Sequence, residues 1–67
     1  MNGFTQFLIA QSLMSRPDFD GHDYEDIWIK AAVLLPGYLK SDLRNQGTDF
    51  QVIESYLDTI PVSELND

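Results

Sequence analysis

Side chains that could bind a metal ion are concentrated in the acid-rich segment 18–26. In the count of a calcium-binding loop, the first, third, fifth and ninth positions hold Asp18, Asp20, His22 and Asp26. The rest of the pattern is missing, because Asp23 replaces the glycine of the sixth position and Ile29 replaces the bidentate glutamate of the twelfth. We therefore expect no bound metal, and a metal-responsive regulator is the least favoured function.

Nucleophilic catalysis finds little support in the sequence. A serine or threonine nucleophile needs a base that a third group orients, and His22 is the only histidine in a chain without cysteine. No serine stands in a glycine-rich elbow or in a Ser-x-x-Lys spacing. A chain of 67 residues also has little room for a substrate pocket beside its own core. We expect neither an enzyme activity nor a cofactor.

Acidic side chains form the first surface that could bind a partner. Eleven acids against four bases give a net charge of −7, which repels the phosphates of nucleic acids and anionic membranes. From residue 49 onward there is no base, and the acids on the helix predicted there are Asp49, Glu54 and Asp58. Such a surface suits a basic protein. In its strongest form it would imitate nucleic-acid phosphates and occupy a nucleic-acid-binding protein.

Apolar side chains form the second candidate surface. Those that fall away from the main apolar stripes of their predicted helices are Ile9, Leu13, Ile29 and Val33. Tyr24 and Trp28 are nearby in the sequence, and aromatic residues are frequent anchors of protein interfaces. We expect Trp28 to lie mostly in the core. Either the first-helix pair, Ile9 and Leu13, or the second-helix pair is expected to be partly exposed to a partner or to a second copy.

Two helical regions before residue 46 must position these side chains. The first is predicted over residues 5–14, and its side assigned to the core carries Phe4, Phe7, Leu8 and Met14. Pro17 ends this helix because proline has no amide donor. The second region spans residues 24–45 with Asp23 as its N-cap. It contains Pro36-Gly37, which predicts a kink or a break into two helices.

The third region has the clearest one-sided pattern. Thr48 and Gln51 have capping-box spacing, and the apolar stripe that follows contains Phe50, Ile53, Tyr56, Leu57 and Ile60. Pro61 ends the helix, and residues 62–67 have no strong pattern, so we expect them to fray. The predicted fold class is all-α: a small bundle of three to four helices over residues 1–61 with a short C-terminal tail.

Composition narrows the function further. With 43% hydrophobic residues the chain is too apolar for a disordered segment. It has neither the features of a signal peptide nor the roughly 20 apolar residues that span a bilayer, so a cytoplasmic protein is expected. Small acidic proteins without catalytic motifs include immunity proteins, antitoxins and virus-encoded inhibitors. By this analogy of class the sequence favours an adaptor or inhibitor that binds a larger protein, with nucleic-acid mimicry as the alternative.

Overall fold

Helices form every regular element of the computed structural model, which describes residues 2–65. α1 (Asn2–Met14) is followed by the 3-10 turn η1 (Pro17–Phe19) and by α2 (Tyr24–Lys40). The 3-10 turn η2 (Asp42–Gln46), α3 (Phe50–Asp58) and the short α4 (Val62–Leu65) come next. The predicted all-α class is confirmed, and no strand occurs among the described residues.

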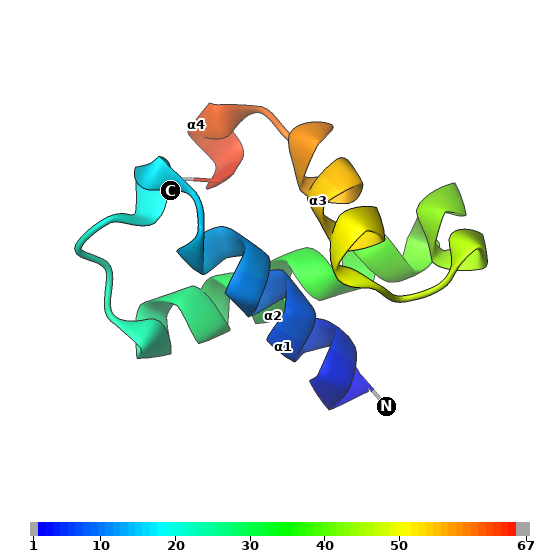
Figure 1. The fold of residues 1–67 in the computed structure, drawn as a ribbon, viewed down its shortest axis with the longest axis horizontal. Helices are drawn as coiled ribbons and strands as arrows, with labels where there is room; N and C mark the ends of the chain where they lie inside the picture. The colour runs from blue at the N-terminus through cyan, green and yellow to red at the C-terminus, as the bar shows by residue number, and fades with distance from the viewer. Residues whose placement is uncertain (1, 66–67) are drawn as a thin grey trace.

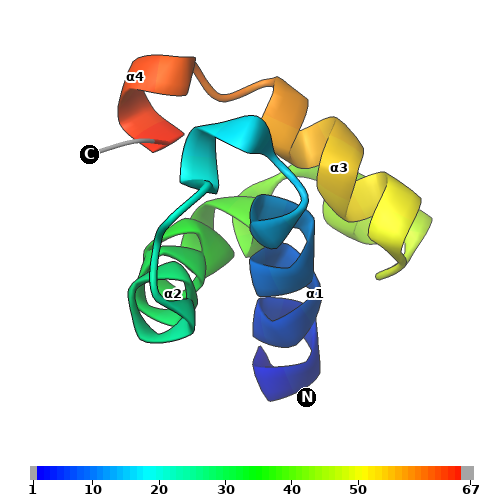
Figure 2. The same cartoon turned by 60° about the vertical axis from the view of Figure 1, so that its left-hand side comes forward.

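Three helices enclose the core, and the short elements η1 and α4 lie together at one end of it. α1 crosses in front of α2 in Figure 1, and the two helices form the most extensive contact of the fold. α3 packs against α1 and lies near the C-terminal part of α2. Figures 1 and 2 both show α4 beside η1, at the end of the molecule away from the N-terminus.

The buried side of α1 is opposite to the predicted one. Ile9 and Leu13 are completely buried, whereas Phe4 is 60% exposed. Phe7 and Met14, on the same side as Phe4, are exposed as well. The expectation that Ile9 and Leu13 could face a partner is therefore wrong, and of the four residues on the opposite stripe only Leu8 packs against the core.

Small side chains explain which side of α1 faces inward. Thr5, Ala10 and Ser12 lie next to Ile9 and Leu13 along the helix and are also buried. Helices approach each other closely where the side chains between them are small. The inward side therefore lets α1 pack tightly against α2 and α3, while the bulky aromatic side would hold the helices apart.

α2 runs without a break through Pro36 and Gly37 and ends at Lys40, earlier than predicted. The hydroxyl of Tyr56 on α3 donates a hydrogen bond to the carbonyl oxygen of Leu34 at 3.1 Å. A Cβ atom at Gly37 would lie only 2.5 Å from that hydroxyl oxygen, so the close approach of α3 requires glycine. Burial raises the pKa of the Tyr56 hydroxyl, which therefore stays protonated and able to donate.

Two segments without a helical pattern contribute to the core. Phe19 in η1 is buried, and Leu65 in α4 is completely buried. The ammonium group of Lys30 on α2 donates a hydrogen bond to the carbonyl oxygen of Glu64, which ties α4 to α2. The prediction of a fraying tail is therefore wrong up to Leu65, and its last two residues lie outside the described part of the chain.

α3 begins one residue later than predicted. Asp49 is the N-cap instead of Thr48, and its carboxylate accepts a hydrogen bond from the backbone amide of Val52 at 2.9 Å. The predicted apolar stripe of this helix is confirmed at its centre, since Ile53 and Leu57 are completely buried.

Candidate functional site

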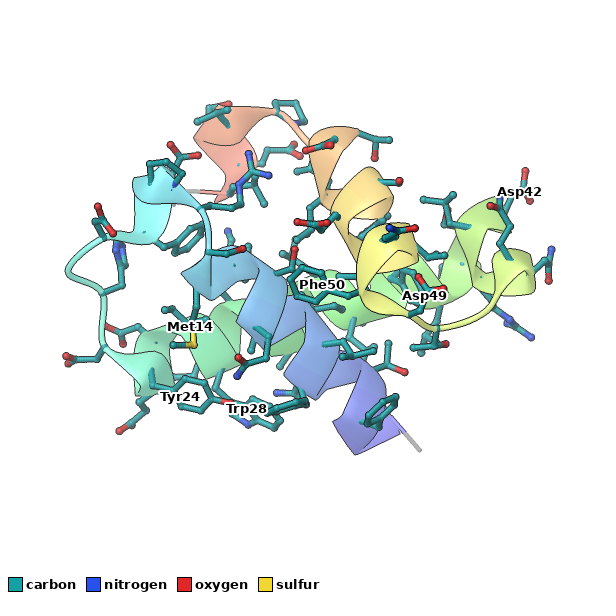
Figure 3. The ribbon with its side chains drawn as sticks, in the orientation of Figure 1. Met14, Tyr24, Trp28, Asp42, Asp49 and Phe50 are labelled. Atoms are coloured by element: carbon teal, nitrogen blue, oxygen red, sulfur yellow. The ribbon has the colours of Figure 1, made fainter. Side chains whose placement is uncertain are left out.

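A groove with aromatic walls lies between α1 and the first half of α2. It is a shallow hollow of about 400 Å³, wide open to solvent, and is lined by Phe7, Tyr24, Glu25 and Trp28. We call these residues the aromatic groove. Figure 3 shows the side chains of Tyr24 and Trp28 next to each other along one edge of the molecule, with Met14 pointing toward the same edge. Phe7 is 43% exposed and Tyr24 is 44% exposed, so the walls are open to solvent.

Helical spacing and one hydrogen bond position the walls. Tyr24 and Trp28 are one turn apart on α2, and their rings stack with centroids 6.2 Å apart and planes inclined by 28°. The side-chain amide of Gln6 on α1 donates a hydrogen bond to the carbonyl oxygen of Trp28 at 3.1 Å. This bond links the two helices next to Phe7, so the aromatic walls belong to rigid elements rather than loops.

The groove has acidic residues near it, at the N-terminus of α2. Glu25 lines it, and Asp23 and Asp26 flank Glu25 at the N-terminus of α2. Asp23 occupies the N-cap position without a capping hydrogen bond from its side chain, so its carboxylate is available to other groups. Carboxylates at this position also complement the positive end of the helix dipole. No basic residue lines the groove.

A second exposed apolar surface lies further round α2. Ile29 is 55% exposed and Val33 is 65% exposed. These two side chains are one helical turn apart, on the side of α2 that faces away from the buried residues Ala31 and Leu34. Of the two apolar pairs considered from the sequence, only this one lies on the surface.

The structure places the remaining apolar candidates differently. Trp28 is half-buried: it packs against the core and also forms a wall of the groove. Phe7 joins the groove although the sequence assigned it to the core. The available signal was that α1 is apolar on both sides, because a small bundle can bury only one of them.

The acidic candidates do not form one free surface. Asp49 is used as the N-cap of α3. Asp58 pairs with the guanidinium group of Arg16 at 3.3 Å, and the same guanidinium lies 3.8 Å from the carboxylate of Asp18. Glu54 is exposed. Two of the three predicted acidic residues therefore have a structural use.

Two further tests concern metals and membranes. Among residues 2–65, no three histidine, cysteine, aspartate or glutamate side chains gather closely enough to hold a metal ion. No helix of the described chain has the length and apolar character needed to cross a membrane.

The site therefore consists of an aromatic groove lined by one carboxylate, Glu25, and an exposed apolar pair on the same helix. Comparison of the chain with protein family models, with curated proteins and with solved structures gives no match in any of the three.

Proposed function

We propose that this protein is a binding module, an adaptor or an inhibitor, which docks on a larger protein through the aromatic groove. The exposure of the groove's aromatic walls carries this proposal. Aromatic side chains are enriched among the residues that dominate binding energy at protein interfaces. Here they stand on rigid helices and line a groove instead of being scattered singly over the surface.

The size of a normal interface extends the proposed surface beyond the groove. A standard interface covers roughly 800 Å² on each partner, and the accessible surface of this chain is 4290 Å². A partner of ordinary size would therefore cover about a fifth of the molecule. The groove residues are too few for that area, so the neighbouring exposed residues Phe4, Met14 and Ile29 are expected to contribute.

Nucleic-acid mimicry receives less support than apolar docking. A mimic needs carboxylates that are free to meet the basic groups of its target. Asp49 and Asp58 already have partners within the chain, as cap and as ion pair. Of the three residues, Glu54 alone is left without such a use, and one carboxylate does not reproduce the repeated charges of a phosphate backbone.

Capture experiments with matched variants test the proposal. The protein would be immobilised and exposed to native cell lysate, with parallel washes at low and high salt and identification of bound proteins by mass spectrometry. We expect the double variant Phe7→Ser with Tyr24→Ser to lose a partner that the wild type retains at high salt.

The control for this experiment is Phe50→Ser, which removes an exposed aromatic residue from α3 (Figure 3). This variant should capture the same partner as the wild type. Equal capture by the groove double variant would rule out the groove as the docking site. Loss of the partner at high salt from the wild type as well would favour the acidic surface and mimicry.

A further inference from the structure

The aromatic groove combines ring faces with carboxylates, and this combination selects for positive charge. We infer that the groove holds an arginine side chain from a basic segment of the partner protein, with its guanidinium over the rings of Tyr24 and Trp28 and within reach of Glu25. The inference rests on the proposed function and adds the chemistry of the partner to it. Cations bind over tryptophan and tyrosine faces, and guanidinium groups pair well with carboxylates.

The charges near the groove favour a cation as its occupant. The N-terminus of α2 contributes about half a positive charge through its helix dipole. Asp23, Glu25 and Asp26 carry three negative charges at the N-cap and first turn of α2, and of these Glu25 lines the groove. Between Pro17 and Ile29 the sequence has five acids and no lysine or arginine. The acidic side chains of this segment therefore outnumber the partial positive charge at the N-terminus of α2.

The same charges argue against a second copy of this chain as the occupant. A second copy also carries a net charge of −7. Three of its four bases have uses within the chain: Arg16 pairs with Asp18 and Asp58, and Lys30 and Arg44 donate hydrogen bonds to the carbonyl oxygens of Glu64 and Leu39. A basic partner gains from the long-range attraction that a second copy would lose.

The shape of the groove favours arginine over lysine. The guanidinium group is planar, is weakly hydrated for a cation and stacks on aromatic rings, whereas an ammonium group is compact and strongly hydrated. The rings of Tyr24 and Trp28 are inclined by only 28°, so a planar group that lies parallel to one ring is nearly parallel to the other. The volume of about 400 Å³ lies near the small end of ligand pockets, so the occupant is one or two side chains.

A peptide pair tests the inference directly. The first peptide is short, acetylated, and alternates arginine with leucine. The second has citrulline at each arginine, which keeps the shape and removes the charge. Trp28 is the single tryptophan of the chain, so its fluorescence reports binding in the groove. We expect saturable binding of the arginine peptide, about fivefold tighter than that of the citrulline peptide.

Two isosteric variants separate recognition by the groove from general attraction between opposite charges. Glu25→Gln and Glu54→Gln remove the same charge, but only Glu25 lines the groove. Glu25→Gln should lower the affinity for the arginine peptide by about two- to fivefold, while Glu54→Gln should leave this affinity unchanged. Circular dichroism would verify that both variants are folded.

Each other outcome overturns the inference. Equal affinity for the citrulline peptide would show that the groove does not select a cation. Equal weakening by Glu25→Gln and Glu54→Gln would show that only net charge matters. In either case a lysate partner that still depends on Phe7 and Tyr24 would leave the proposed function standing. Arginine-peptide binding without such a partner would instead refute the docking role.

Discussion

The hydroxyl of Tyr56 reaches the carbonyl oxygen of Leu34 at 3.1 Å by passing the backbone of α2 at Gly37. The ring of Tyr56 also packs edge-on against the ring of Tyr38, with centroids 5.4 Å apart. These contacts join α3 to the middle of α2, where Pro36 has removed a helical hydrogen bond. The Pro36-Gly37 pair thus forms the part of α2 against which Tyr56 of α3 packs, and it does not break the helix.

Replacement of Gly37 by alanine tests this contact between α2 and α3. The new Cβ would lie 2.5 Å from the Tyr56 hydroxyl oxygen, and we expect Gly37→Ala to lower the free energy of unfolding by about 1–3 kcal/mol. In a Tyr56→Phe background the nearest ring carbon is 3.8 Å from the Cβ. There the same change should stabilise the protein by up to about 1 kcal/mol, the helix propensity of alanine over glycine. Urea unfolding of the four proteins measures this reversal, and the same effect in both backgrounds would contradict it.

The raised pKa of Tyr56 predicts a loss of stability at alkaline pH. Burial lifts this pKa above its ordinary value of 10.0. The folded and unfolded proteins both keep the proton below that value, so stability is unaffected there. Above it the unfolded chain loses the proton first, and stability falls as pH rises. Urea midpoints from about pH 8 to about pH 11 should fall less steeply for Tyr56→Phe than for the wild type. Parallel curves would exclude Tyr56 as a source of the decline.

The N-cap of α3 can be assigned by two alanine variants. Asp49→Ala removes the acceptor of the Val52 amide and should destabilise the protein by about 1 kcal/mol. Thr48→Ala should change stability by less than about 0.5 kcal/mol, because the structure gives Thr48 no capping role. Thermal unfolding of both variants compares the two positions. A larger effect at Thr48 would restore the capping box expected from the sequence.

The packing of α4 predicts a large effect from a residue near the C-terminus. Leu65 is completely buried, and Leu65→Ala should lower the free energy of unfolding by about 2–4 kcal/mol. Val62 on the same short helix is 53% exposed, so Val62→Ala serves as the control and should have little effect. If the two variants were equally stable in urea, α4 would not be part of the core.

Charged substitutions should separate the core side of α1 from the exposed side of α2. Leu13→Asp places an unpaired charge in the core and should unfold the protein, with a loss above about 4 kcal/mol. Ile29→Asp alters an exposed residue and should remain folded, within about 0.5 kcal/mol of the wild type. Circular dichroism distinguishes the two variants. Only the folded Ile29→Asp protein is then informative in a binding assay.

Local periodicity was sufficient to predict the buried residues of a helix that has a single apolar side. The stripe of α3 placed Ile53, Tyr56 and Leu57 in the core correctly, because a helix with one apolar side has only one way to bury it. The start of α2 after Asp23 and the end of α1 before Pro17 also followed from the sequence. Helix ends of this kind are determined by residues adjacent in the sequence, so the sequence alone predicts them.

The candidate surface could be predicted only in part. Ile29, Val33 and Trp28 were singled out as partner residues, and the first two are indeed exposed. The groove that Trp28 forms with Phe7 and Tyr24 could not be predicted, because it exists only once α1 crosses α2 at a particular angle and with a particular side inward. Whether these residues bind a partner stays a prediction.

The sequence by itself determined the all-α class, the one-sided burial of α3 and the excess of negative charge. Tertiary structure decided which side of α1 is buried and which is left to form the groove. It also brought Phe19 and Leu65 into the core. The physical reason is that an apolar pattern shows which side chains would gain free energy from burial. Which of them are buried depends on which helix surfaces fit closely against each other. Small residues on α1, the glycine of α2 and the short α4 control that fit, and their partners are distant in the sequence.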